Sequence, residues 1–171
     1  MRPIQQVHLI SRTPGNAEKL AAEIATWANA LQVNIAATPQ AAIAQADMII
    51  TATTSSTPLF DGNDVAEGTH ITAIGAYTPQ MQEIDAVTVN KSRVVVDSRQ
   101  ACLAEAGDII IPQAKIDAEL GEIINGVKPG RQSETEITFF KSVGIAVQDA
   151  IAAATVLTEA QTRGLGTVVE L

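Results

Sequence analysis

Two short apolar runs, each followed at once by small and hydroxyl-bearing residues, constrain the fold of this chain most strongly. The run MII (48–50) leads into TATTSS (51–56), and ITAI (71–74) leads into GAYT (75–78). Both runs are too short for helices, and their apolar character is typical of strands buried on both faces of a parallel sheet. Ligands of open α/β sheets bind beyond the carboxyl ends of such strands, so we expect a binding site where these two runs stop.

The rest of the chain alternates between short apolar runs and helical patterns. Further strands are predicted at residues 7–10, 34–37, 93–98 and 138–142, with a brief extended piece at 109–112, and helices at 14–31, 40–45, 79–83, 100–106, 114–120 and 143–163. Thr13 and Thr38 each precede a proline and are the predicted N-caps of their helices. Strands joined through helices in this way form parallel pairs with right-handed crossovers, which predicts an α/β fold.

Two of the predicted helices carry apolar stripes that would cover the sheet. The first stripe runs through Leu20, Ile24, Trp27 and Leu31, and the second runs along the last helix through Ile145, Ile151, Ala152, Val156 and Ala160. This spacing is typical of helices with one buried face. The tail at 167–171 is predicted to be an edge strand or a docking arm.

Composition excludes several classes of function. The 171 residues suffice for one domain with a sizeable core, and the net charge of -8 with a pI near 4.6 argues against nucleic acid or an anionic membrane as partner. The single Cys102 rules out an internal disulfide and a multi-cysteine zinc site, and it suits a reducing, cytoplasmic location. No apolar run approaches the roughly 18 to 20 residues of a membrane span. His8 and His70 stand alone in the sequence, so we expect them to be structural and expect no metal site.

Three strand-to-helix junctions carry groups that can bind a ligand. Ser11, Arg12 and Thr13 lie where a dinucleotide-binding fold holds the adenosine ribose, and an Arg with hydroxyls suits a 2′-phosphate; the alternative is a surface charge beside a helix cap. The hydroxyls of residues 51–56 suit a phosphate or a ribose, and ordinary hydroxyl-capped turns are the alternative. The amides of the turn at 141–144 would face the same ligand, unless that turn only caps the following helix.

Six segments, in order along nearly the whole chain, resemble the ornithine cyclodeaminase/mu-crystallin family. They are ISRTP, DMIITATTSSTP, HITAIGAYTPQMQEI, RVVVDS, AELGEIINGVKPGR and ITFFKSVGIAVQDAIAA. The resemblance implies a Rossmann-like, doubly wound parallel sheet that binds NAD or NADP, in a single domain over 1–171 with a C-terminal helix and tail at 143–171. Members of the family include ornithine cyclodeaminase, an alanine dehydrogenase, and reductases of cyclic imines such as pyrroline- and piperideine-carboxylate.

The resemblance also implies roles for individual residues. Ser11, Arg12 and Thr13 would hold the adenosine end of the cofactor, with Arg12 favouring NADP over the alternative, NAD. Thr53 would touch the ribose-diphosphate region. The nicotinamide would lie over Ile74, Gly75, Ala76 and Tyr77, and its other side would be closed by Ser142 and, next to the substrate, Val143.

One departure from the family concerns Tyr77. Cyclodeaminases carry at this position an aspartate that takes and returns protons during amine oxidation and cyclisation. A phenol, with an ordinary pKa near 10, is a poor general base at neutral pH. Reduction of a preformed imine needs no such base, because hydride goes to carbon and the nitrogen can take a proton from water. The sequence therefore favours reduction of cyclic imino acids, with no catalytic residue assigned; ornithine cyclodeaminase and alanine dehydrogenase are the alternatives.

A second departure concerns the start of the fold. The family's Rossmann domain begins with a strand and a GxGxxG turn, and a catalytic and dimerisation domain precedes it; neither GxGxxG nor that domain is found in this sequence. We therefore expect the chain to be the cofactor-binding part of an NADP-dependent protein that is a homodimer when complete, acts on a small imino or amino acid, and is N-terminally truncated here. Alone it is expected to be inactive, and an inactive remnant that acts as a binding module is the remaining alternative.

Overall fold

The structure is a computed structural model that describes residues 3–27, 31–167 and 169. Its elements are β1 (Gln6–Leu9), α1 (Pro14–Ile24), β2 (Gln32–Ile35), α2 (Pro39–Ile43), β3 (Met48–Thr51), the 3-10 turn η1 (Gly62–Asp64), β4 (His70–Ala73), α3 (Ala86–Lys91), β5 (Ser92–Val96), α4 (Arg99–Glu105), α5 (Gly107–Ile110), β6 (Ala118–Glu119), α6 (Leu120–Ile124), β7 (Ile137–Lys141) and α7 (Ala146–Thr162). The strand pairs among these residues are all parallel, so the predicted α/β class is confirmed.

The larger sheet has the strand order β3-β4-β7-β5-β6. Strand β7, which comes last along the chain, lies between β4 and β5, and Lys141 at its end is in register with Ala73 on one side and Val96 on the other. The carboxyl ends of β4, β7 and β5 therefore meet at one edge of the sheet, where α/β proteins bind their ligands.

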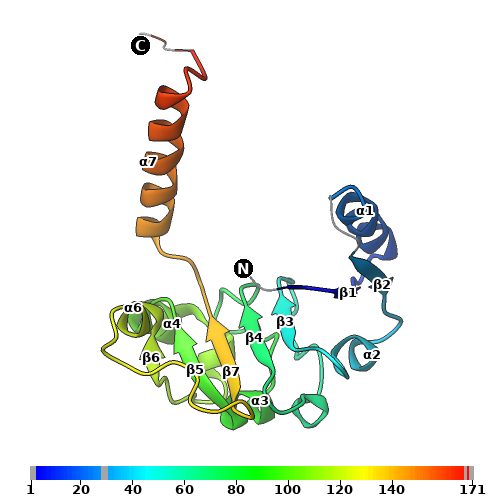
Figure 1. Cartoon of the computed structure of the whole chain (residues 1–171). Helices are drawn as coiled ribbons and strands as arrows, with labels where there is room; N and C mark the ends of the chain where they lie inside the picture. The colour runs from blue at the N-terminus through cyan, green and yellow to red at the C-terminus, as the bar shows by residue number, and fades with distance from the viewer. Residues whose placement is uncertain (1–2, 28–30, 168, 170–171) are drawn as a thin grey trace.

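Strands β1 and β2 form a separate two-stranded sheet. Figure 1 shows them with α1 beside the larger sheet. Among the residues that the structure describes, β1 pairs only with β2, and β3 pairs only with β4. Each of these two strands therefore keeps one edge without a strand partner.

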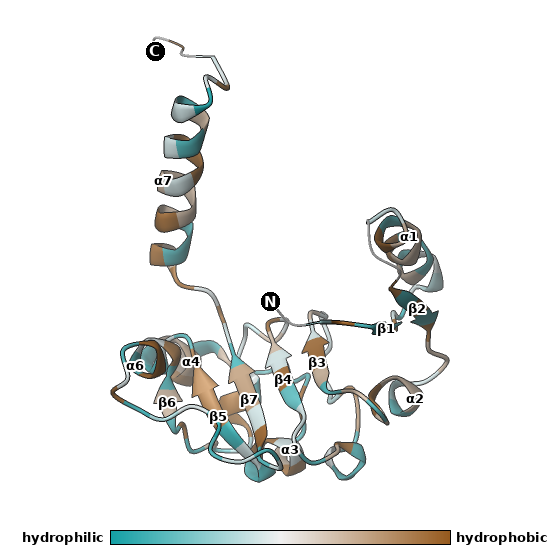
Figure 2. Cartoon of the chain, viewed as in Figure 1, coloured by the Kyte–Doolittle hydropathy of each residue, from teal (hydrophilic) through white to brown (hydrophobic). Residues whose placement is uncertain are grey.

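The core lies against one face of the larger sheet. Side chains of alternate residues, among them Ile71, Val96 and Phe139, are buried there together with Cys102 of α4 and Ile109 of α5. On the opposite face Ile50 is 67% exposed, and Figure 2 shows apolar residues of β3 on the outer part of the sheet. Only one face of β3 is therefore buried, although its sequence predicts burial on both.

The prediction that the last helix lies on the sheet is wrong. Helix α7 has no buried residue, Ile151 is 62% exposed, and Figure 1 shows the helix projecting away from the sheet. The chain turns outward at Gly144, whose φ of +83° is easily adopted only by glycine. Apolar periodicity predicts a helix correctly, but it does not say what the apolar side will cover.

The stripe predicted for the first helix is also wrong in part. Helix α1 buries Ala17 and Ile24 and ends at Ile24, so Trp27 lies beyond it and is 53% exposed. The helix predicted at 40–45 is confirmed as α2, with the Thr38 hydroxyl accepting a hydrogen bond from Ala41 N. Of the predicted tail strand, Thr167 and Val169 have no strand structure, and residues 168, 170 and 171 lie outside the described residues.

The predictions for three short elements are wrong because hydrogen bonds between residues far apart in the sequence determine the secondary structure there. No helix forms at 79–83, since Glu83 N donates to the distant Asp108. The next helix along the chain is α3, which begins at Ala86 and is capped by Asp85. The predicted helix at 114–120 is replaced by β6 and α6, because Asp117 bonds to Val94 of β5 through both its backbone and its carboxylate. The predicted extended piece at 109–112 begins inside the helical turn α5.

Candidate functional site

The loops that follow β3 and β4 touch each other at the carboxyl edge of the sheet. Gly75 is buried, and a Cβ added to it would lie 2.1 Å from the carbonyl oxygen of Thr53. No side chain can be accommodated at that distance, so the contact requires glycine at position 75. The structure therefore brings together two of the residues predicted for the site, Thr53 and Gly75.

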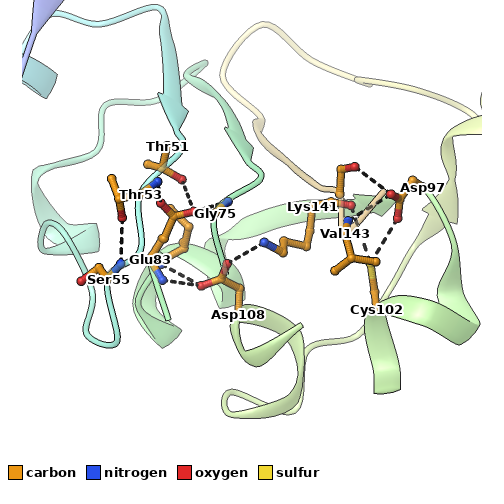
Figure 3. Close-up of polar contacts among 12 residues, drawn as sticks. Thr51, Thr53, Ser55, Gly75, Glu83, Asp97, Cys102, Asp108, Lys141 and Val143 are labelled. Atoms are coloured by element: carbon orange, nitrogen blue, oxygen red, sulfur yellow. Dashed lines mark hydrogen bonds and ion pairs between the residues drawn. The ribbon is translucent and has the colours of Figure 1, made fainter. Parts of the chain in front are cut away.

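The buried carboxylate of Glu83 binds both loops. Its Oε1 accepts from Thr53 N at 2.6 Å, and its Oε2 accepts from Gly75 N at 2.8 Å and from the Thr51 hydroxyl at 3.0 Å (Figure 3). Glu83 is fully buried, so these bonds replace its hydration. Sequence reasoning missed this residue, because a glutamate in a polar stretch gives no local sign that it is buried.

A buried ion pair lies behind Glu83. Lys141 Nζ at the end of β7 is 3.2 Å from Asp108 Oδ2, and neither side chain is exposed. With both groups removed from water, each opposite charge stabilises the other as an ion pair. Asp108 Oδ1 accepts from the backbone N of Glu83 at 2.7 Å and of Ile84 at 2.9 Å. Burial raises the pKa of Asp108, and these amides together with the ammonium group oppose that rise.

A second carboxylate, Asp97, binds the turn between β7 and α7. Its Oδ2 accepts from the Ser142 hydroxyl at 2.7 Å, from Val143 N at 3.0 Å and from Gly144 N at 2.9 Å. The prediction that the amides of this turn face a ligand is therefore wrong for Val143 and Gly144, since both point to Asp97. A lone aspartate after a strand does not reveal such distant partners.

The hydrogen bonds to Asp97 also lower the pKa of its carboxyl group. Burial by itself would raise the pKa of Asp97, but four donors outweigh it and leave the pKa below its ordinary value. These donors are the hydroxyl of Ser142, the amides of Gly144 and Ser98, and the thiol of Cys102. Asp97 is therefore a carboxylate at neutral pH, and it holds the turn as an anion.

The turn at 142–144 lies directly beside the loop after β4. Ser142 N donates to Ala73 O at 3.1 Å, and Ile74 N donates to Thr51 O at 2.9 Å. Of the residues predicted to underlie the nicotinamide, Ile74 and Tyr77 are exposed and Ala76 is buried. Ile74 and Tyr77 are therefore available to a ligand, whereas Ala76 supports the loop from inside.

Ser11, Arg12 and Thr13 lie apart from this group. They follow β1 in the smaller sheet, and no hydrogen bond or ion pair within the described part of the chain joins them to the larger sheet. Thr13 occupies the N-cap position of α1, but its side chain makes no capping bond. The structure thus brings together the residues predicted around the nicotinamide and does not bring the adenosine-end residues to them.

A hollow lies at the opposite edge of the sheet. It has a volume of about 300 Å³ and is lined by residues before β3, β4 and β7, including Asp47, Glu67 and Glu134. Its acidic lining suits no anionic dinucleotide, and it lies at the amino ends of the strands, so it is distinct from the candidate site. Among residues 3–27, 31–167 and 169, no group of His, Cys, Asp or Glu is arranged to hold a metal ion, and no helix is long and apolar enough to cross a membrane.

This chain matches a family model and is similar to proteins of known activity. The model of the ornithine cyclodeaminase/mu-crystallin family matches residues 1–164. A Δ1-pyrroline-2-carboxylate reductase of Bacillus cereus is 40% identical over 99% of this chain and 54% of its own length. The ketimine reductase mu-crystallin of Macropus fuliginosus is 42% identical over 87% of this chain and 45% of its own length.

A solved structure gives the same result for the fold. The Δ1-pyrroline-2-carboxylate reductase of Thermococcus litoralis, in complex with NADH and L-proline, matches with a TM-score of 0.93 and 39% identity over 98% of this chain and 54% of that chain. This likeness confirms the predicted Rossmann-like fold class. The chain spans about half the length of the relatives that it matches.

Proposed function

The chain belongs to the ornithine cyclodeaminase/mu-crystallin family, and on that basis we propose that it is the nicotinamide-binding part of a reductase of cyclic imino acids. The observation that carries the proposal is the likeness, at a TM-score of 0.93, to a pyrroline-carboxylate reductase holding NADH and L-proline. The substrate class is a five- or six-membered cyclic imine with a carboxylate next to the imine carbon. A nicotinamide cofactor, when bound, supplies the hydride for that carbon.

The residues at the carboxyl edge fit a nicotinamide. The exposed Ile74 offers an apolar surface to the nicotinamide ring. The close contact of Gly75 with Thr53 packs the two loops tightly together, so the loop after β4 leaves space for the ring above it. The Thr53 hydroxyl accepts from Ser55 N at 3.1 Å, and its own O–H is left to donate to a ribose or diphosphate oxygen. Ser142 and Val143 lie beside this loop and would close the other side of the ring, next to the substrate.

For the cofactor we propose NADPH, with NADH as the alternative. Arg12 is exposed, and no ion pair within the described residues engages it. A guanidinium group recognises a phosphate through two parallel hydrogen bonds, so Arg12 suits the 2′-phosphate that distinguishes the two cofactors. Ser11 and Thr13 would add neutral hydrogen bonds to the same group.

The exposed Tyr77 favours imine reduction over cyclodeamination. A phenol does not accept a proton readily at neutral pH, and oxidation of an amine needs a group that does. During reduction of an imine, the group that needs a proton is the substrate nitrogen, and water can supply that proton. Tyr77 would therefore act as a wall of the site rather than as a base.

The proposal is tested on a complete protein, made by joining this chain to the part of the Bacillus cereus reductase that lies outside the match. With NADPH and pyrroline-2-carboxylate it should form proline and consume the cofactor in equal amounts. The isolated chain, run in parallel, should show no reduction. A folded complete protein that reduces neither pyrroline- nor piperideine-carboxylate would overturn the proposal.

A further inference from the structure

The hydroxyl of Ser142 is held in one hydrogen-bonding role by Asp97. The Ser142 hydroxyl lies 2.7 Å from Asp97 Oδ2, and an ionised carboxylate has no proton to give, so Ser142 must be the donor. Gly144 N donates to the same hydroxyl oxygen at 3.2 Å. One lone pair of the Ser142 oxygen therefore remains, and any further partner of this hydroxyl has to be a hydrogen-bond donor.

The carboxylate that imposes this role is itself fixed. Asp97 Oδ1 accepts from Ser98 N at 2.7 Å and from the thiol of Cys102 at 3.3 Å, while Oδ2 accepts the three donors of the turn. With both oxygens engaged, the carboxylate cannot rotate without breaking several bonds at once. The backbone of Asp97 is bonded as well, because its N donates to Lys141 O at 3.2 Å.

This arrangement gives the Ser142 oxygen more negative character than an isolated hydroxyl has. Donation to an anion polarises the O–H bond, and hydrogen bonds in such a chain strengthen one another. The matching partner is a cationic N–H group. A protonated cyclic imine has one N–H, which carries positive charge, and the secondary ammonium of the product has two.

We propose that Asp97 is a positioning residue that holds the Ser142 hydroxyl as a hydrogen-bond acceptor for the cationic ring nitrogen of the substrate. The proposal rests on the function proposed above, and it adds which atom of the chain recognises the imine nitrogen. It also makes Ser142 a group that discriminates between rings: a ring with N–H is favoured, and a ring of the same shape with oxygen in that place is not. Asp97 itself need not touch the substrate.

The first test uses the chain alone and needs no cofactor. In Asp97→Asn the amides of Val143 and Gly144 lose a charged acceptor, so their exchange with solvent should become about 10-fold faster, while the β7 amides of Phe139 and Phe140 keep their rates. The matched control is Asp64→Asn. Asp64 is exposed, and its side-chain carboxylate accepts no hydrogen bond from the described residues. Unchanged exchange at Val143 and Gly144 would overturn the claim that Asp97 holds the turn.

The second test measures inhibition of the complete protein by two rings, L-proline and tetrahydrofuran-2-carboxylate. The two differ in the ring atom that would face Ser142. Both Ser142→Ala and Asp97→Asn should weaken inhibition by proline about 10-fold and leave inhibition by the oxygen ring within about 2-fold.

The double variant separates positioning from general damage. If Asp97 acts through Ser142, then Asp97→Asn should have little further effect on proline inhibition in the Ser142→Ala background. Equal losses for both rings, or additive losses in the double variant, would overturn the proposal. An inactive parent protein would instead contradict the proposed function, and the exchange measurement on the chain alone would still decide whether Asp97 holds the turn.

Discussion

Replacing Glu83 by Gln should destabilise the chain far more than its small change in shape implies. The two oxygens of Glu83 accept backbone N–H groups from different loops, Thr53 at Oε1 and Gly75 at Oε2. A glutamine has one oxygen and one NH₂ group in these places. Whichever way the amide is turned, its NH₂ group faces a backbone N–H that also donates.

The size of the effect follows from these contacts. One charge-assisted hydrogen bond is lost and one buried N–H is left unpaired, which we expect to lower the free energy of unfolding by about 2–4 kcal/mol. The Thr51 hydroxyl at 3.0 Å can rotate and accept from the new NH₂ group, so it adds little to the loss. For a chain of this size the change corresponds to a melting temperature lower by roughly 5–15 °C.

Urea denaturation of the chain measures this directly, with Glu67→Gln as the control. Glu67 is exposed, and its carboxylate has no hydrogen-bond partner among the described residues. The control should change the unfolding free energy by less than about 0.5 kcal/mol. A Glu83→Gln protein as stable as this control would refute the argument that one buried carboxylate joins the β3 and β4 loops.

Three further results are expected. Gly75→Ala should cost about 1–3 kcal/mol of stability or more, because the added Cβ meets Thr53 O, whereas Gly15→Ala, with nothing within 4 Å of its Cβ, should cost nothing; equal urea midpoints would contradict this. Burial and the nearby Asp97 charge raise the pKa of the Cys102 thiol to about 12, so at pH 8 only about one thiol in ten thousand is ionised. Labelling by a thiol reagent should wait for unfolding, and rapid labelling of the folded chain would show that the thiol is accessible. In the complete protein, Arg12→Asp should shift the kcat/KM ratio from NADPH toward NADH by an amount worth about 1.5–3 kcal/mol, and an unchanged ratio would remove Arg12 from the cofactor site.

The parts of the fold that the sequence predicts well are those decided by local pattern. The apolar runs that become β3, β4 and β7 are located within one or two residues, because alternation with turn residues marks both ends of each strand. The small residues Gly75 and Ala76 likewise mark the end of β4. The ends of such a strand can be located from a few residues that are adjacent in the sequence.

The residues that organise the site cannot be found from the sequence, because their roles depend on distant partners. Glu83 and Asp108 interact across 25 positions, and Asp97 and Ser142 across 45. A carboxylate that accepts buried N–H groups looks in sequence like any surface carboxylate. Only the order of the strands, with β7 between β4 and β5, brings these groups to the same edge.

The central claim is that this chain serves reduction of cyclic imines rather than cyclodeamination, and one comparison tests it most directly. The complete protein is given pyrroline-2-carboxylate with NADPH in one assay and ornithine with NADP in another, and proline and ammonia are measured in both. We predict a much larger kcat/KM for pyrroline-2-carboxylate, with proline formed and no ammonia released, because position 77 carries no carboxylate to serve as the base for amine oxidation. Rapid release of ammonia from ornithine, at a kcat/KM equal to or above that for the imine, would contradict the account.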